Sequence, residues 1–181
     1  MKISTDVKAN RLYSPQLVGL ITTIDSSGKP NVATFAWITS VSSNPEMIAV
    51  CLAPKRYTYE CIAQSKEFVI NLPTVDIIDK VWFCGKHSGR DVDKFKETGL
   101  TPLDSIRVKP PRIKECAAHL ECKLANTFEI GDHIVVIGEV IAKSCEDGTM
   151  VDGSLDVAKV KPLLHAGGSK FVVASEVVDV K

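Results

Sequence analysis

Two cationic side chains stand directly before a predicted helix, at a spacing that could bind an anion. Lys55 and Arg56 precede residues 58–65, TYECIAQS, which have the pattern of a short helix. The first N–H groups of a helix lack internal partners and its dipole favours negative charge, so a phosphate can bind there. The Arg56 guanidinium has a fork that matches phosphate oxygens. The same residues are also compatible with a solvated loop in which Thr58 only caps the helix.

The preceding segment, residues 31–58, adds a surface suited to a flat ligand. Residues 31–41 alternate, so a regular strand would place an amide, an indole and a hydroxyl on one face, contributed by Asn31, Trp37 and Thr39. Thr34 falls on the opposite face, so it could share a ligand with Trp37 only through backbone atoms or a bulge. After the Asn44-Pro45 turn, residues 47–53 are apolar throughout and predict a strand buried on both faces. We therefore interpret residues 31–58 as a cradle for a cofactor.

Two further polar residues have open interpretations. Residues 84–99 begin with a polar, glycine-containing loop and predict a short helix from about Asp91 to Gly99. Phe95 in this helix can face the core, whereas Lys94 beside it is either solvated or reaches toward a ligand. His133 begins a predicted strand and is compatible with an ordinary surface histidine. Loops of this kind often have functional roles.

The other elements are mainly strands. Residues 17–24 and 31–41 predict an antiparallel hairpin, and further strands are expected at 67–72, 115–125, 133–143 and 171–178. A turn region at 126–132 separates the two long strands. Residues 74–83 predict a helix with Thr74 as N-cap and one apolar face made by Ile77, Ile78, Val81 and Trp82. These patterns predict a mainly β protein, an antiparallel barrel with peripheral helices, in a single domain over residues 1–181.

Composition excludes several partners. The chain has 181 residues with 22 basic and 22 acidic side chains, so its formal net charge is zero and nothing favours nucleic acid or an anionic membrane. The first residues lack the apolar run of a signal peptide, and no stretch approaches the ~20 apolar residues of a membrane span. We therefore expect a cytoplasmic protein.

No motif indicates that side chains alone perform the chemistry. The six cysteines include no CxxC pair, no histidine has ligand spacing beside one, and we predict no metal site. Cys116 and Cys122 share the apolar face of a strand, as core residues do. GxGxxG, GxxxxGK[ST], GxSxG and HExxH are all absent, and no catalytic residue is predicted. A redox reaction would need a flat, phosphorylated cofactor to supply the reactivity.

Five segments in order then resemble one family. They are NVATFAW, NPEMIAVCLAPKRYTYE, EFVINLP, CGKHSGRDVDKF and GDHIVVIGEV. Together they are similar to the FMN-binding split-barrel family of flavin reductase-like proteins, most of all to its flavoredoxin-like branch. The similarity covers about residues 12–145, with a weaker match in LLHAGGSKF. It implies a six-stranded Greek-key barrel, a homodimer and FMN bound near the subunit interface.

The resemblance also implies a cofactor site, made of Asn31, Thr34, Trp37, Arg56, Tyr57, Thr58, Lys94, His133 and Phe171. The first three would border the isoalloxazine and ribityl parts of FMN, with Thr34 using backbone atoms. Residues 56–58 would hold the phosphate. Lys94 and His133 would approach from other segments, and Phe171 would close over the ring.

Three functions follow for comparison. The first is an FMN-containing oxidoreductase that takes hydride from NADH or NADPH and passes electrons to free flavin, ferric iron or a protein acceptor. The second is a flavoredoxin-type electron carrier that pyridine nucleotide does not reduce directly. The third is a barrel with a structural or other ligand-binding role and no flavin.

Overall fold

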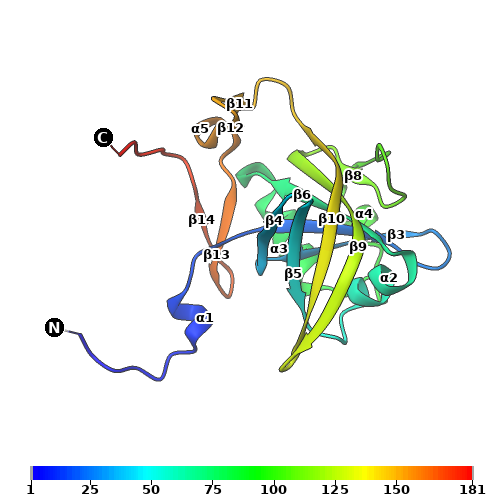
Figure 1. Ribbon diagram of the computed structural model, residues 1–181, viewed down its shortest axis with the longest axis horizontal. Helices are drawn as coiled ribbons and strands as arrows, with labels where there is room; N and C mark the ends of the chain where they lie inside the picture. The colour runs from blue at the N-terminus through cyan, green and yellow to red at the C-terminus, as the bar shows by residue number, and fades with distance from the viewer. Residues whose placement is uncertain (1, 181) are drawn as a thin grey trace.

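Seven antiparallel strands form the main sheet of the computed structural model, which describes residues 2–180. Their order is β3-β2-β6-β9-β10-β5-β4. Their bounds are β2 Gly19–Ile24, β3 Pro30–Phe35, β4 Ile38–Ser43, β5 Glu46–Leu52, β6 Glu67–Pro73, β9 Cys116–Ile130 and β10 His133–Cys145. The first and last strands of this order are consecutive in the chain, so the sheet curls until its two edges meet (Figure 1). The predicted mainly β barrel with peripheral helices is confirmed.

The expected six strands become seven because the predicted strand 31–41 is divided. β3 pairs with β2, β4 pairs with β5, and only Ala36 and Trp37 lie between them. The carbonyl of Trp37 still accepts a hydrogen bond from the N–H of Cys51 at 2.9 Å. A segment that passes from one edge of a curled sheet to the other must bend, so the predicted alternation over 31–41 is wrong beyond Phe35. The predicted hairpin of β2 and β3 is confirmed.

The two longest strands extend further than predicted. The β9–β10 ladder continues to the pair Ile130 and His133, so the turn contains only Gly131 and Asp132. Gly131 has φ +60°, a conformation that glycine adopts without steric cost. The expected turn region at 126–132 is therefore mostly strand, and it forms the far end of the hairpin in Figure 1.

Two polar side chains of β9 are buried against a loop. The Glu121 carboxylate accepts hydrogen bonds from the N–H groups of Ile106 and Arg107, both at 2.7 Å. His119 donates its Nε2–H to Ile113 O, 2.9 Å away. β8 (Arg112–Ile113) and the loop before it cover this face of β9 and supply the partners. Cys116 and Cys122 are buried core residues, as predicted.

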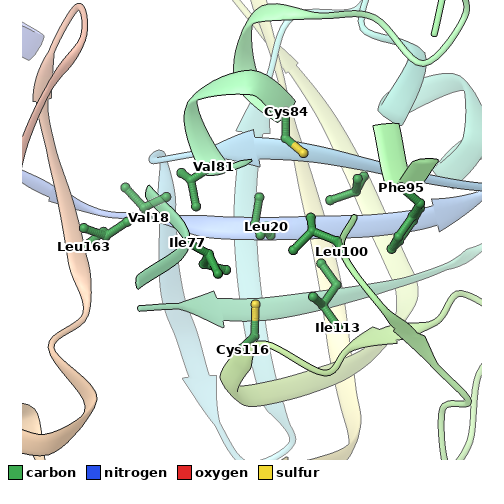
Figure 2. Packing of buried hydrophobic residues seen from close by; sticks show 11 residues of the cluster. Val18, Leu20, Ile77, Val81, Cys84, Phe95, Leu100, Ile113, Cys116 and Leu163 are labelled. Carbon is green, nitrogen blue, oxygen red and sulfur yellow. The ribbon is translucent and has the colours of Figure 1, made fainter. Parts of the chain in front are cut away.

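Two apolar clusters lie on opposite sides of β2. Ile21 packs inside the barrel with Phe68 and with Ile62 of α2 (Tyr57–Ser65). Leu20, on the other face of β2, packs against Val81 of α3 (Ile78–Lys86) in the second cluster. Figure 2 shows this second cluster, with α3 lying over β2 and β3. The two clusters hold α2 and α3 close to the β3–β4 junction.

The helices begin close to their predicted positions. Thr74 is the N-cap residue of a 3-10 turn, η1 (Val75–Ile77), that leads into α3. α4 (Lys94–Thr98) begins three residues after Asp91 because the Asp93 side chain accepts the N–H of Lys96 as its cap. It ends at Gly99 as predicted. Two short helices complete the set, α1 (Ala9–Leu12) and α5 (Val157–Val160).

A second, small sheet stands beside the barrel. It has the order β1-β13-β14, with bounds Gln16–Leu17, Leu163–Gly167 and Lys170–Val173. The predicted strand 171–178 therefore ends at residue 173. Figure 1 shows α1 and the chain termini extending away from the barrel near this sheet. Two further short ribbons are β7–β8 (Pro102–Leu103 with Arg112–Ile113) and β11–β12 (Met150–Val151 with Ser154–Leu155). None of the described helices has the length and apolar character needed to cross a membrane.

Candidate functional site

A cavity of about 610 Å³ opens where the β3–β4 junction, the start of α2, the end of α3 and the β13–β14 hairpin come together. All nine residues that the resemblance assigned to a cofactor line this cavity. They come from segments that lie up to 140 positions apart in the chain, from residue 31 to residue 171. The fold thus gathers the predicted residues into one site.

The β3–β4 junction supplies one wall. Asn31 is only 5% exposed, and its Nδ2 donates to Thr23 Oγ1 at 3.2 Å. Its Oδ1 is buried without a hydrogen-bond partner among the described residues. A buried acceptor of this kind is costly unless a ligand or water donates to it. Thr34 donates its hydroxyl to Val81 O at 2.6 Å, so its side chain is occupied by α3. The break at Ala36 and Trp37 explains how Thr34 and Trp37 reach the same cavity.

The start of α2 supplies an anion site. Arg56 is the N-cap residue in an extended conformation, and no side chain caps the helix. Thr58 lies inside the first turn and is 3% exposed, so the interpretation of Thr58 as the cap is wrong. The first N–H groups of this nine-residue helix therefore depend on a ligand or solvent. Tyr57 donates its hydroxyl to Asp25 at 3.1 Å, and burial with this contact raises the pKa of Tyr57 to about 12.

Lys94 lies on the cavity as a buried cation. It is 4% exposed, and its Nζ donates to Cys84 O and His87 O, both at 3.1 Å. No carboxylate forms an ion pair with it among residues 2–180. Burial lowers the pKa of Lys94 to about 8. The solvated interpretation of Lys94 is wrong, and its uncompensated charge would attract an anionic group.

Aromatic rings occupy two sides of the cavity. Trp37 and His133 contact each other with their ring centres 4.7 Å apart and their planes tilted by 35°, and His133 Nδ1 lies 2.6 Å from Asp132 Oδ1. Phe171 meets Trp82 edge to face at 6.4 Å. Flat apolar surfaces with placed polar groups are typical of cofactor sites.

Sequence reasoning missed part of the lining, chiefly Trp82, Lys86, His87, Arg90 and His165. Helical periodicity assigned Trp82 to the core, but it is 37% exposed and faces the cavity. The loop after α3 was noted only as polar. Because residues 84–90 contain two glycines, Lys86, Arg90 and a histidine directly after the predicted helix 74–83, they carried a signal that could have identified the loop.

The loop after α3 is fixed to the start of α2. Arg90 donates to Lys55 O at 3.2 Å, forms an ion pair with Glu60 and lies over the Tyr57 ring. A Cβ at Gly89 would overlap Asn31 Oδ1, so glycine permits the close approach of loop and strand. The described lining contains five Lys or Arg residues and no Asp or Glu. In a chain of balanced charge, this one-sided lining suits an anionic ligand.

Comparison with known proteins agrees with this chemistry. The family model for the Flavin reductase like domain matches residues 11–174. The chain belongs to the flavin reductase-like family. The match extends past the five segments that carried the resemblance and includes the β13–β14 hairpin.

Individual relatives place the chain within this family. A protein of Archaeoglobus fulgidus is 37% identical over 148 residues, which are 81% of this chain and 82% of the relative. The reductase component of a 4-nitrophenol 4-monooxygenase/4-nitrocatechol 2-monooxygenase from Rhodococcus opacus is 28% identical over 71% of this chain and 65% of its own. The structure of flavoredoxin from Desulfovibrio vulgaris (Miyazaki F) superposes with a TM-score of 0.90 at 30% identity, covering 99% of this chain and 97% of that one.

Proposed function

We propose that the protein binds FMN in this cavity and acts as an NAD(P)H-dependent flavin oxidoreductase. The observation that carries the proposal is one cavity lined by an uncapped helix start, a buried unpaired lysine and aromatic rings, without a carboxylate in its described lining. Its volume of about 610 Å³ lies within the 300–1,000 Å³ range common for ligand pockets.

The phosphate of FMN would bind at α2. Arg56 would offer its guanidinium, and the N–H groups of Tyr57 and Thr58 would point to the phosphate from the first turn. Lys55, on the same side of the cavity, would add a second positive charge. A phosphate carries about −1.5 to −2 charges at neutral pH, which these groups would neutralise.

The buried Asn31 Oδ1, which has no hydrogen-bond partner among the described residues, bears on how the ribityl chain of FMN would fit. It needs a hydrogen-bond donor, and a ribityl chain carries hydroxyl groups that can donate. Asn31 lines the cavity, so a bound ligand could supply this donor. The residues present therefore suit FMN.

The ring would lie among the aromatic residues. Trp37 with His133 would border it on one side, Phe171 would close over it, and the backbone near Thr34 would contact its edge. Bound FMN would supply the redox chemistry, because its ring system exchanges hydride and electrons. Lys94 would place a fixed positive charge nearby and favour any state in which the ring gains negative charge.

The reductant and acceptor are part of the proposal. NADH or NADPH would deliver hydride, and free flavin, ferric iron or a protein would accept electrons. The relative from Rhodococcus opacus, a reductase component of a monooxygenase, supports this assignment. The likeness to flavoredoxin supports a second candidate, an FMN electron carrier that pyridine nucleotide does not reduce.

We also infer a homodimer. The resemblance implies one, and apolar side chains of the N-terminal arm such as Leu12 and Tyr13 are highly exposed in the single chain. Burying them against a second copy would remove apolar surface from water. Light scattering on a sizing column should give twice the mass of 19.7 kDa, and a monomer would contradict the inference.

Anaerobic spectroscopy separates the two candidates. The protein is loaded with FMN, separated from free flavin, and mixed with NADPH or NADH in the absence of oxygen. Bleaching of the flavin band supports the oxidoreductase, whereas a band unchanged by either nucleotide but bleached by dithionite supports the carrier. Failure to retain FMN would contradict both.

A further inference from the structure

The loop between α3 and α4, residues 87–93, meets the cavity at two points. At its base, the carbonyl of His87 accepts a hydrogen bond from Lys94 Nζ at 3.1 Å. Near its middle, Arg90 reaches across to α2. The loop therefore joins the two parts of the cavity to which the proposed function assigns the flavin ring and the phosphate.

Three contacts hold the Arg90 guanidinium against the start of α2. Its Nη1 donates to the Lys55 carbonyl at 3.2 Å, and its Nη2 forms an ion pair with Glu60. Its Cζ lies 5.0 Å from the centre of the Tyr57 ring. Lys55 precedes the helix, Tyr57 is its first residue and Glu60 lies in its first turn. Arg90 therefore fixes the chain on both sides of Arg56, whose own guanidinium is proposed to bind the phosphate.

The backbone of the loop is fixed as well. Gly89 packs so closely on the neighbouring elements that a Cβ there would overlap Asn31 Oδ1 and touch the Tyr57 ring. The Ser88 hydroxyl accepts the N–H of Arg90 at 3.2 Å, and the Ser88 carbonyl accepts two further N–H groups of the loop. Arg90 thus extends from a backbone that cannot easily shift, so its position is passed on to α2.

The Arg90–Glu60 pair should add little to the stability of the fold. Both side chains are 46% exposed, and ion pairs at such exposure contribute little to folding. The pair between Lys143 and Glu46 is similarly exposed and lies outside the described cavity lining. Arg90 differs from Lys143 because all its side-chain contacts converge on the residues around the proposed phosphate contact.

We propose that Arg90 is a positioning residue for the flavin phosphate. It holds the turn before α2 and the first turn of the helix in the arrangement that the phosphate requires, without contacting the phosphate itself. Because its charge is paired with the Glu60 carboxylate, it attracts an incoming anion less than an unpaired guanidinium would. A preformed site binds more tightly because less conformational freedom is lost on binding. The inference rests on the proposed function, since FMN supplies the phosphate.

Substitutions of Arg90 separate position from charge. Arg90→Gln should weaken FMN by about fivefold to tenfold and riboflavin, which lacks the phosphate, by less than about twofold. Arg90→Lys keeps the charge but loses the fork that contacts Lys55 and Glu60 together, so it should remain at least about threefold weaker than the wild type. Fluorescence titration measures both flavins. Wild-type affinity in Arg90→Lys, or equal losses for the two flavins, would overturn the proposal.

Glu60→Ala decides whether Arg90 acts on the phosphate directly. Removing a carboxylate near an anion site favours anion binding, and alanine favours the helix, so α2 stays formed. An Arg90 that bound the phosphate itself would be released by this change, and FMN would bind more tightly. An Arg90 that positions the helix start should lose its hold, and FMN should bind about threefold more weakly despite the lost negative charge. Tighter or unchanged FMN binding would overturn the proposal.

Lys143→Gln is the matched control, because it removes an exposed ion pair outside the described cavity lining. Both flavins should bind to it within about twofold of the wild type. All variants should unfold at nearly the same temperature as the wild type, since each removes only exposed contacts. A loss of FMN affinity in Lys143→Gln as large as that in Arg90→Gln would remove the assignment to Arg90.

Hydrogen exchange of FMN-free protein gives a measurement without ligand. The N–H of Arg56 donates to Ala53 O at 3.0 Å, and the N–H groups of Tyr59 and Glu60 donate to Arg56 O. These three amides should exchange faster in Arg90→Gln than in the wild type and in the Lys143→Gln control, because the turn that they close is no longer held. Unchanged exchange at all three would contradict the positioning role.

The outcomes distinguish the two proposals. Wild-type protein that binds no FMN would contradict the proposed function and the positioning role together. If the wild type binds FMN more tightly than riboflavin and the variants at residues 60 and 90 do so equally well, the positioning role alone is wrong.

Discussion

Two lysines on one cavity differ in almost every physical respect. Lys94 is 4% exposed and bonded to two carbonyls, whereas Lys86 is exposed and held only by its position over the Trp82 ring. A buried, fixed charge acts strongly on a nearby ligand because little solvent screens it. An exposed charge is screened and flexible. In the proposed function, the resident FMN would therefore lie on the buried side of the cavity, beside Lys94.

The largest expected effect comes from removing the buried charge. Lys94→Met should weaken FMN binding by about tenfold to a hundredfold, or ~1.4–3 kcal/mol, since a desolvated charge contact to the ring is lost. Lys86→Met should change FMN affinity by less than about twofold. Isothermal titration with FMN measures both. If both variants lose FMN affinity to a similar extent, the two lysines do not differ in their effect on FMN.

The phosphate site at α2 should respond selectively. Arg56→Ala should weaken FMN by about tenfold, or ~1.4 kcal/mol, and leave the binding of riboflavin, which lacks the phosphate, nearly unchanged. Fluorescence titration with both flavins gives the ratio. Arg107→Ala serves as the control, since Arg107 is exposed and outside the cavity lining. An equal loss for both flavins would place Arg56 away from the phosphate.

The two tryptophans provide a parallel comparison. Trp37→Ala should weaken FMN by up to about tenfold, since it removes the ring that contacts His133 and is proposed to border FMN. Trp82→Ala should leave FMN affinity almost unchanged. Competition against a fluorescent flavin would rank the two variants by their affinity for FMN. A larger loss in Trp82→Ala than in Trp37→Ala would show that FMN lies against Trp82 instead.

The last effect concerns the stability of the FMN-free protein and its dependence on pH. Burial lowers the pKa of Lys94 to about 8 from 10.5, so between these values the unfolded chain binds more protons at this site than the folded protein. This group therefore makes FMN-free protein more stable as pH rises from 8 to 10.5. Urea unfolding of wild type and Lys94→Met should show the free energy of unfolding of the wild type rising relative to that of the variant across this range, because the other groups that titrate there are common to both proteins. If the free energy of unfolding changes with pH in the same way in both proteins, burial does not destabilise the charged form of Lys94, and this prediction is wrong.

The sequence predicted the resident side better than the exposed side. Residues 31, 37 and 56–58 lie in one continuous segment. That segment therefore already contained the residues proposed to border the flavin ring and those proposed to bind the phosphate. Lys94 and His133 also reached the cavity, although the residues alone left a solvated alternative for each. Whether these residues bind FMN stays a prediction. Their gathering into one cavity is a finding.

The remaining features depend on long-range structure. The division of strand 31–41 is set by where the curled sheet meets its own edge, and the alternation of side chains is similar on both sides of the bend. Trp82 fits the apolar periodicity of α3, and only the position of the β13–β14 hairpin decides that it faces the cavity instead of the core. Neither fact is contained in a local pattern.

FMN titration of the wild-type protein tests the central claim most directly. One FMN per chain should bind, and riboflavin should bind at least tenfold more weakly, because it cannot use the cationic start of α2. Equilibrium dialysis gives both the number of sites and the two affinities. Protein that binds no FMN, or that binds FMN and riboflavin equally well, would contradict the account.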